Sequence, residues 1–435
     1  MSWYFLLAIA GAFLFTQFLL GIPIFVAFML TIAIGTWMLI GPAGFSMLAN
    51  SFYDTATTTS LASIPLFILM GEVLFRSGSM QVLFDSVDRL IGRVRGRQYV
   101  LTVTLSALFG ALSGSAMAVA AMLGRAIMPD TAARGYDRKM MGGAILGGAT
   151  LAPIIPPSIL AIIVGTLANI SIAQLLIAGI LPGLMMAALF LIYISIRMRL
   201  RPDLAPPLDE SVIRAPLSEK LRAVLRMLPF LVIIFMVMGL ILLGIATPSE
   251  SAATGVVGAL ITAAIYGRLS MRMVIQSFAA AAMIAAGILV IMITSKMFTQ
   301  LLAFTGATRA LVSLVTDLGL GPLTMLLMML LLTFVLCMFV DQIAIMLILI
   351  PLFDPLIRAF GFDLTWFWML FLFNMTLGGI TPPMGYTIFA FQSVGPGMSL
   401  QDSYRAVIPF VLLFVVGIAL MITFPQIVTL LPGLL

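Results

Sequence analysis

The 435-residue sequence contains no histidine and one cysteine, and charged side chains make up only 9% of it. Without histidine there is no imidazole base, no histidine-ligated metal and no histidine proton relay. The single cysteine, Cys337, lies within an apolar run, so the sequence offers neither an intramolecular disulfide nor a cysteine cluster for a metal. No nucleophile with a paired base and no ATP-binding P-loop is visible. We therefore expect a protein that is not an enzyme and that uses no organic cofactor.

Hydrophobic residues are abundant instead, at 62% of the sequence. Apolar runs of about 17 to 25 residues recur along the chain, which is the length that crosses the hydrocarbon core of a bilayer as a helix. The runs are continuous and lack the period of two that membrane strands show. The formal net charge of +6 fits cytoplasmic basic anchors better than nucleic-acid binding. These features predict an all-α polytopic membrane protein in contact with lipid and with no nucleic-acid partner.

Two Gly/Pro-rich stretches, residues 147–158 and 374–385, interrupt apolar segments. Proline lacks an N–H donor, so each break leaves carbonyl oxygens without a helical partner. At membrane depth such backbone persists only where protein covers it or where it lines a cavity. We therefore expect broken helices over residues 140–169 and 364–394.

An internal repeat relates the two breaks. A shift of 226 positions places Pro156 and Pro157 on Pro382 and Pro383. The same shift aligns other punctuating residues, Gly135 with Gly361 and Asp137 with Asp363. Glycine and proline in register are hard to obtain by chance in an apolar chain. We therefore divide the chain into a first repeat (1–200), a cytoplasmic linker with an amphipathic helix over Leu217–Arg226 (201–226), and a second repeat (227–435).

Each repeat also contains a predicted re-entrant hairpin, at about 98–130 and 322–357. In the first hairpin, each apolar arm of roughly ten residues is too short to cross the membrane, although a pair of tilted helices is an alternative. Five crossings plus one hairpin per repeat invert the second copy, so both termini are predicted to be periplasmic. The hairpin tips, near Ser113 and Gln342, are then expected to be accessible from opposite sides. Residues 50–60 are expected to form a polar connection, and one span is expected over 281–298.

Charge agrees with this topology, because it places every lysine and arginine except Lys296, Arg309 and Arg358 on the cytoplasmic side. Inverted repeats with broken helices are typical of secondary transporters, whose substrate and coupling ions bind at the breaks. A channel is a weaker alternative, because two inverted hairpins suit alternating access better than an open pore.

Hydroxyl, amide, carboxylate and freed carbonyl oxygens at the breaks are ligands that Na⁺ accepts. Two or more Na⁺ ions, and no other metal, are therefore expected. The hypothetical first site contains Ser113, Ser115, Gly148, Thr150 and Pro153. The hypothetical second site contains Asp341, Asn374, Thr376, Gly379 and Thr381. Hydrogen bonding of these hydroxyl groups to neighbouring helices is the alternative.

Asp341 is flanked by apolar residues, where a carboxylate is usually functional or paired. It is predicted either to bind Na⁺ or a proton, or to pair with a partner such as Lys296. Arg125, on the returning arm of the first hairpin, is the nearest cation for an anionic substrate, although it could instead extend to the membrane interface. The hypothetical substrate site contains Ser115, Arg125, Pro156, Pro157, Pro382 and Pro383.

Five short motifs together resemble one family. They are Gly110-Ala-Leu-Ser-Gly-Ser115, Gly135-Tyr136, Pro156-Pro157-Ser158, Ala178-Gly-Ile-Leu-Pro-Gly183 and Thr381-Pro-Pro-x-Gly385. The chain resembles, over nearly its whole length, the large membrane subunit of tripartite ATP-independent periplasmic (TRAP) transporters, the DctM-like family. The resemblance implies a fold of the ion-transporter superfamily with elevator-type motion, in a bacterial inner membrane.

The resemblance also implies Na⁺-driven uptake of an organic anion such as a C4-dicarboxylate, sialic acid or another carboxylate. Two partners are implied: a small four-helix membrane subunit (Q type) and a periplasmic substrate-binding protein (P type). No additional four-span domain is recognised at the N-terminus, so the small subunit is expected to be a separate polypeptide. The alternative is a stand-alone Na⁺/dicarboxylate or citrate symporter of the same superfamily.

Overall fold

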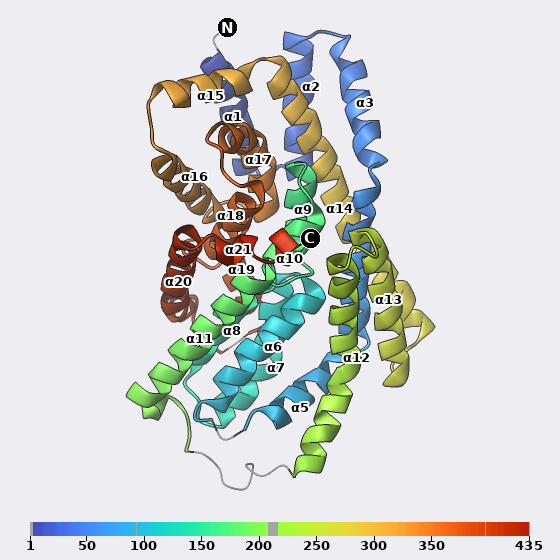
Figure 1. Ribbon diagram of the computed structural model, residues 1–435, viewed down its shortest axis with the longest axis vertical. Coiled ribbons are helices and arrows are strands. Elements are labelled where there is room, and N and C mark those ends of the chain that lie inside the picture. The colour runs from blue at the N-terminus through green and yellow to red at the C-terminus, as the bar shows by residue number, and fades with distance from the viewer. Residues whose placement is uncertain (1–2, 93, 208–215, 396, 435) are drawn as a thin grey trace.

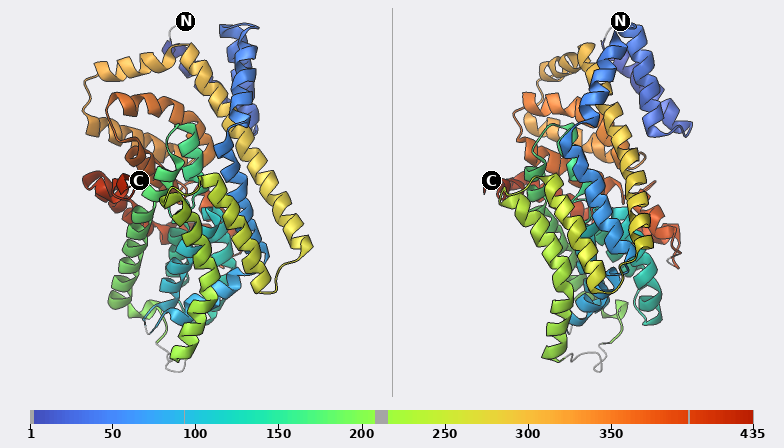
Figure 2. Two further views of the ribbon diagram at one scale, coloured as in Figure 1. Left: turned by 45° about the vertical axis from the view of Figure 1, so that its right-hand side comes forward. Right: turned by 90° about the vertical axis from the view of Figure 1, so that its right-hand side faces the viewer.

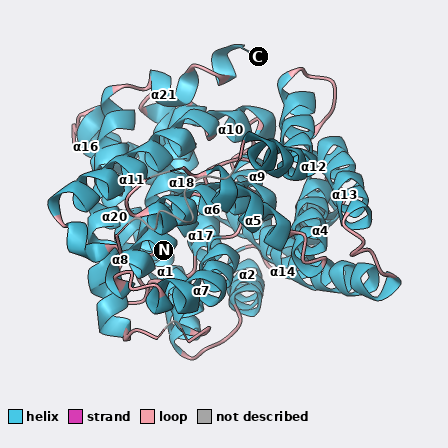
Figure 3. Cartoon of the chain, turned by 90° about the horizontal axis from the view of Figure 1, so that it is seen from below, coloured by secondary structure: helices cyan, strands magenta, loops and turns pink. Residues whose placement is uncertain are grey.

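The computed structural model describes residues 3–92, 94–207, 216–395 and 397–434. Within these ranges the regular elements are helices, and no strand occurs (Figure 3). Six helical segments of the described chain are long and apolar enough to cross a membrane. The prediction of an all-α polytopic membrane protein is therefore confirmed.

The first half of the chain contains a helical hairpin followed by an interrupted helix. Its helices, in chain order, are α1 (Trp3–Leu19), α2 (Ile24–Leu39), α3 (Gly44–Ala56), η1 (Thr59–Ala62), α4 (Ser63–Arg76), α5 (Met80–Leu90), α6 (Arg97–Ser113), α7 (Ala116–Ala133), α8 (Arg138–Ala149), α9 (Ile159–Leu167), α10 (Ile172–Ala178), α11 (Ile180–Leu200) and η2 (Pro202–Leu204). Helices α6 and α7 form the first hairpin, and the chain is interrupted between α8 and α9.

The second half repeats this order of a hairpin followed by an interrupted helix. Its helices are α12 (Leu217–Leu242), α13 (Pro248–Ile265), α14 (Met271–Phe304), α15 (Ala307–Asp317), α16 (Pro322–Cys337), α17 (Gln342–Ala359), α18 (Leu364–Gly378), α19 (Tyr386–Gln392), α20 (Leu400–Thr423), α21 (Gln426–Thr429) and η4 (Pro432–Leu434). Figure 1 places the hairpin α6–α7 in the lower half of the molecule and the hairpin α16–α17 in the upper half. The assignment of the two halves as inverted repeats remains a prediction.

Two helices are longer than the sequence predicts. The expected polar connection over residues 50–60 is wrong, because α3 continues to Ala56. Hydroxyl groups in α3 donate to carbonyls one turn earlier, as from Thr55 Oγ1 to Ser51 O at 2.7 Å, so they do not end the helix. The span expected at 281–298 is part of the 34-residue helix α14. At 1.5 Å per residue, α14 is about 50 Å long and exceeds the thickness of the hydrocarbon core.

The connection between the halves does not contain the separate amphipathic helix that the sequence predicts. The amphipathic helix predicted for Leu217–Arg226 is the beginning of α12, which continues to Leu242. Residues 208–215, which include Arg214, lie outside the described residues. The basic residues Arg197 and Arg199 lie in the last turn of α11, and this helix runs toward the lower part of the molecule (Figure 1).

Most of the helices divide into two packed groups. Helix α4 packs against α13 and α14, and α14 also packs against α2 and α3. We call α2–α4 and α12–α14 the framework, and Figure 2 shows α14 running along one side of the molecule beside the blue helices. We call α6–α11 and α16–α21 the hairpin bundle. The bundle touches the framework mainly where α6 and α9 meet α4, and where α9 and α17 meet α14.

The first halves of both interrupted helices lie at the centre of the hairpin bundle. All residues of α8 from Met140 to Ala149, and all residues of α18 from Trp366 to Gly378, are buried. A helix that is apolar on all faces needs packing on all faces. Glycine allows α20 to approach α8 closely, because a Cβ atom at Gly143 would lie 2.5 Å from the carbonyl oxygen of Ala406.

Candidate functional site

The first break, residues 150–158, leaves backbone oxygens free. Ser158 begins α9, where its hydroxyl oxygen accepts a hydrogen bond from Ala161 N at 3.2 Å. The carbonyl oxygens of Ala152 and Pro157 accept no hydrogen bond from other described residues. The Pro156–Pro157 and Pro382–Pro383 peptide bonds are both cis. Free carbonyls at the first break agree with the absence of proline donors.

The tip of the first hairpin packs directly against this break. A Cβ atom at Gly110 would lie 2.7 Å from Ala152 Cα, so the backbones meet where glycine has no side chain. Gly114, at the turn, has φ +63°, which favours glycine, and its Cβ position lies 3.3 Å from the carbonyl oxygen of Pro157. The hairpin tip therefore faces the interrupted helix, as the sequence predicts.

The second hairpin packs against the second break, residues 379–385, in a related way. Asn374 on α18 donates from Nδ2 to the carbonyl oxygen of Leu330 on α16. Gly378 lies against Cys337. A Cβ atom added at Gly378 would lie only 2.3 Å from the Cβ atom of Cys337. The hydroxyl group of Tyr404 donates to the carbonyl oxygen of Pro383 at 2.6 Å.

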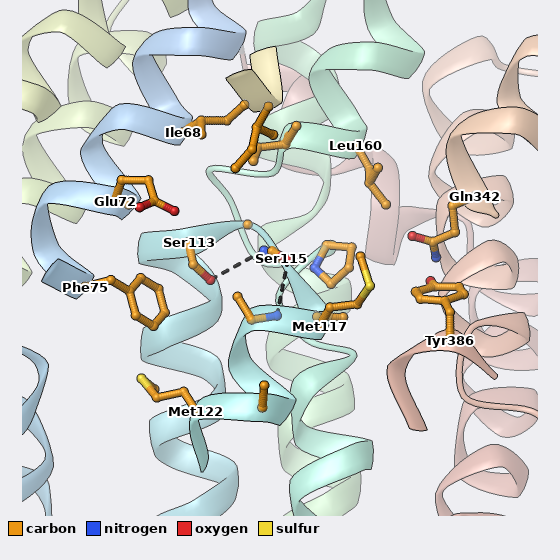
Figure 4. Close-up of a pocket in the computed structure, with 18 of the residues that line it drawn as sticks. Ile68, Glu72, Phe75, Ser113, Ser115, Met117, Met122, Leu160, Gln342 and Tyr386 are labelled. Carbon is orange, nitrogen blue, oxygen red and sulfur yellow. Dashed lines mark hydrogen bonds between the residues drawn. The ribbon is translucent and has the colours of Figure 1, made fainter. Parts of the chain in front are cut away.

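Both hairpin tips border one cavity of about 840 Å³ (Figure 4). Ser113 and Ser115 contribute from the first hairpin, and Asp341 and Gln342 from the second. Figure 4 shows Glu72 of α4 on one side and Gln342 and Tyr386 on the opposite side. The two tips therefore meet at one cavity in this conformation, and the expectation that Ser113 and Gln342 are accessible from opposite sides of the membrane stays a prediction.

Two helices begin at the cavity and direct their N-terminal N–H groups toward it. Ser115 begins α7, and its hydroxyl oxygen accepts from Ala118 N at 3.4 Å. Asp341 begins α17, and its carboxylate oxygen accepts from Ile343 N at 2.9 Å. The N-terminus of a helix carries partial positive charge and favours anions. The start of α7 is capped by a neutral group, whereas a carboxylate already occupies the start of α17.

The remaining charges of the cavity lie on α4 and α7. Arg76 Nε lies 2.7 Å from Glu72 Oε2, so these two charges compensate each other. Among the described residues, Arg125 and Asp341 have no ion-pair partner. Arg125 is ten residues beyond Ser115, or about 15 Å along α7 at 1.5 Å per residue. A small substrate at the hairpin tip therefore does not also contact Arg125.

Lys296 is not the partner of Asp341, which corrects that alternative. Its ammonium group donates to Asn169 Oδ1 at 3.1 Å and to the carbonyl oxygen of Leu167 at 3.5 Å. It lines a second cavity of about 870 Å³, together with Asp54 of α3 and Asp354 of α17. This second cavity also lies between framework helices α3 and α14 and the hairpin bundle. The interface between the framework and the hairpin bundle therefore contains two cavities.

Only some residues of the hypothetical first Na⁺ site line the cavity. Ser113, Ser115 and Pro153 line the 840 Å³ cavity, whereas Gly148 and Thr150 are buried and do not line it. The Thr150 hydroxyl group donates to the carbonyl oxygen of Gly147 and keeps its lone pairs for another partner.

Of the hypothetical second Na⁺ site, only Asp341 lines the cavity. The hydroxyl groups of Thr376 and Thr381 donate to the carbonyl oxygens of Leu372 and Leu377, at 2.8 and 2.7 Å. The amide nitrogen of Asn374 donates to the carbonyl oxygen of Leu330 on α16, and the carbonyl oxygen of Gly379 accepts a hydrogen bond from Thr387 N at 3.2 Å. Coordination of Na⁺ by these residues remains a prediction. No group of three or more His, Cys, Asp or Glu side chains suited to a metal occurs in the described chain.

The hypothetical substrate residues are likewise divided. Ser115 and Arg125 line the cavity, whereas Pro156, Pro157, Pro382 and Pro383 do not. Pro156 and Pro157 are buried. The prolines shape the breaks that support the hairpin tips, and they do not contribute to the cavity wall.

Sequence reasoning did not identify several residues that line the cavity. They are Ile68, Glu72, Phe75, Met117, Met122, Leu160 and Tyr386. Glu72 and Arg76 stand one helical turn apart within an apolar segment, and that spacing could have indicated a pair at membrane depth. The apolar residues carry no such signal, because similar side chains occur throughout the chain.

Comparisons with known proteins cover nearly the whole chain. The model of the family described as "Tripartite ATP-independent periplasmic transporter, DctM component" matches residues 11–427. The ectoine TRAP transporter large permease protein TeaC of Halomonas elongata is 31% identical, covering 94% of this chain and 95% of TeaC. The C4-dicarboxylate TRAP transporter large permease protein DctM of Pseudomonas aeruginosa is 29% identical, covering 92% of each chain.

Two further similarities concern length and fold. The sialic acid TRAP transporter permease protein SiaT of Haemophilus influenzae is 28% identical and matches 96% of this chain, which spans 66% of SiaT. The crystal structure of the Alcanivorax borkumensis YdaH transporter superposes with a TM-score of 0.64, covering 90% of each chain. At 15% sequence identity, that likeness concerns the fold alone.

Proposed function

Because the chain belongs to the DctM component family of tripartite ATP-independent periplasmic transporters, we propose that it carries an organic anion across the bacterial inner membrane, driven by a Na⁺ gradient. Members of this family are transporters and not enzymes. The apolar helices make the chain a multi-pass membrane protein. The coupling ion, the substrate and the mechanism are the parts that we propose.

One observation carries the proposal: both hairpin tips and the framework helix α4 border the same 840 Å³ cavity. The start of α7, which neutral Ser115 caps, offers backbone N–H groups and partial positive charge to a carboxylate. Ile68, Phe75 and Leu160 supply apolar walls for the carbon skeleton. Arg125, about 15 Å away along α7, attracts the anion toward the cavity by its unpaired charge.

Na⁺ binding at the hairpin tips provides the coupling. The Asp341 carboxylate is the strongest oxygen ligand of the cavity, and Ser113 and the free carbonyls of Ala152 and Pro157 add neutral oxygens at the first tip. A bound cation compensates Asp341, which otherwise repels an anionic substrate. Each ligand then raises the affinity for the other, as thermodynamic linkage requires.

Movement of the hairpin bundle along the framework is the step that exposes the site on the other side. The two cavities both lie between the bundle and helices of the framework. At the edge of the first cavity the contact is close, since a Cβ atom at Gly71 of α4 would lie 3.2 Å from the carbonyl oxygen of Leu112 near the hairpin tip. Sliding along this surface narrows the first cavity and widens the second one, which is an elevator-type motion.

Two partners belong to this proposal. A periplasmic substrate-binding protein delivers the anion, and a small four-helix membrane subunit accompanies the chain. The relatives are named for ectoine, sialic acid and C4-dicarboxylates. An organic acid of this general kind is the substrate that we propose.

Reconstitution tests the proposal. Liposomes are prepared with this chain, the small subunit and the binding protein encoded beside it, and uptake of labelled succinate, lactate and sialic acid is measured. We expect uptake of at least one acid that requires an inward Na⁺ gradient and stops when the binding protein is omitted. Uptake by the chain alone would support the stand-alone symporter instead. Uptake that is the same with and without a Na⁺ gradient would refute the proposed coupling to Na⁺.

A further inference from the structure

Gln342 is a polar residue at the wall of the cavity to which the proposed function assigns no role. It is the first residue of α17, beside Asp341 at the tip of the second hairpin. The residue is only 6% exposed, and it lines the 840 Å³ cavity. Figure 4 shows it directed from α17 into the cavity, next to Tyr386.

The amide nitrogen of Gln342 has no hydrogen-bond partner among the described residues. A buried donor without a partner costs free energy, and an oxygen atom of a ligand bound there would offset that cost. The Asp341 carboxylate is engaged with Ile343 N at 2.9 Å. Other buried unpartnered groups, such as Trp368 Nε1 and Thr36 Oγ1, do not line this cavity.

The two hairpin tips differ in charge, and this difference determines which end of an anionic ligand lies at each tip. An amide N–H group only donates, so Nε2 pairs with an oxygen and cannot hold Na⁺. At the second tip the start of α17 is already occupied by the negative Asp341, which disfavours a second carboxylate there. A single Na⁺ ion on Asp341 brings that tip to neutrality and not to a positive charge. At the first tip, the neutral Ser115 leaves the start of α7 available to an anion.

Building on the proposed function, we propose that Gln342 is a specificity-determining residue that donates a hydrogen bond to an uncharged hydroxyl or keto oxygen of the transported acid. The single carboxylate of that acid then lies at the start of α7. The substrate class is therefore a hydroxy or keto monocarboxylate, and a C4-dicarboxylate is disfavoured because its second carboxylate meets Asp341.

Binding to the purified membrane complex tests this without the binding protein. The probes are ¹⁴C-labelled acids in pairs that differ by hydroxyl groups: lactate and propionate, 3-hydroxybutyrate and butyrate, gluconate and hexanoate, with succinate as the dicarboxylate. We expect the wild type, in Na⁺, to prefer the hydroxylated member of at least one pair by about tenfold. Gln342→Leu should bring that ratio close to one and leave the Na⁺ dependence unchanged.

Two further variants keep the result interpretable. Gln342→Met nearly retains the size of the side chain, adds no charge and cannot donate, so it should lose the same preference even if the leucine variant folds poorly. Gln81→Leu, on the exposed face of α5, is the matched control and should keep the ratio. An unchanged ratio in both Gln342 variants, or tighter binding of succinate than of every hydroxy acid, would overturn the inference. If Na⁺ promotes binding of none of the probes, the proposed function fails as well.

Discussion

Lys296 on framework helix α14 donates a hydrogen bond to Asn169 Oδ1, 3.1 Å away, at the end of α9 in the hairpin bundle. The same ammonium group reaches the carbonyl oxygen of Leu167, which ends α9. A cation at the C-terminal end of a helix is favourable. This contact therefore ties the bundle to the framework in the conformation described.

Removing the contact should shift the conformational equilibrium. A partly exposed charged hydrogen bond contributes about 1 kcal/mol, so Lys296→Met should lower the ratio of this conformation to the alternative one roughly fivefold. The readout is the rate at which a membrane-impermeant maleimide labels a Ser113→Cys variant in the 840 Å³ cavity. Lys220→Met, near the start of α12, is the matched control. Equal labelling rates with and without Lys296 would show that the contact does not hold the bundle.

Arg125 should act on substrate entry and not on binding at the hairpin tip. It has no ion-pair partner among the described residues, and it lies about 15 Å along α7 from Ser115. Arg125→Gln should raise the KM for the transported acid roughly threefold or more at low salt and leave the maximal rate nearly unchanged. The effect should shrink at high ionic strength, where charges are screened.

A matched control separates steering from a general loss of positive charge. Arg134 lies at the end of the same helix, 3.0 Å from Asp130. Arg134→Gln should leave the KM unchanged within a factor of two. Equal effects of the two substitutions, or a fall in maximal rate without a change in KM, would contradict a steering role for Arg125.

Close packing between α8 and α20 makes a stability prediction. A Cβ atom at Gly143 would lie 2.5 Å from the carbonyl oxygen of Ala406, which is backbone and cannot move aside. Gly143→Ala should therefore destabilise the protein by about 1–3 kcal/mol. Gly239→Ala in α12, where nothing lies within 4 Å, should be neutral or stabilising by up to about 1 kcal/mol. Heat-unfolding midpoints of the purified variants measure both, and equal midpoints would contradict the packing argument.

The sequence predicted the parts of this fold that leave local signals. Apolar run length indicated the spans, and the prolines at 156–157 and 382–383 indicated the two breaks. The end of α3 was misplaced because serine and threonine, which are also typical of loops, bond within the helix here. The full length of α14 was missed because its flanks are less apolar than its centre.

The candidate site was predicted less completely, because it depends on tertiary contacts. Ser113, Ser115 and Asp341 were identified from their polarity at membrane depth, and the structure places all three at one cavity. Asn374 bonds instead to α16, and Lys296 bonds to the end of α9. The choice of partner for a buried polar group depends on neighbours that are distant in sequence, and spacing alone does not encode it.

The central claim is that an organic acid and Na⁺ bind together at the hairpin tips, and equilibrium binding tests it most directly. Binding of the transported acid to the purified membrane complex is measured against Na⁺ concentration, with choline replacing Na⁺ at constant ionic strength, in the wild type and in Asp341→Asn. We predict that acid affinity rises with Na⁺ in the wild type by tenfold or more, and that Asp341→Asn raises the Na⁺ concentration needed for half of that increase. Acid binding that is the same in Na⁺ and choline, or an unchanged Na⁺ dependence in Asp341→Asn, would contradict the claim.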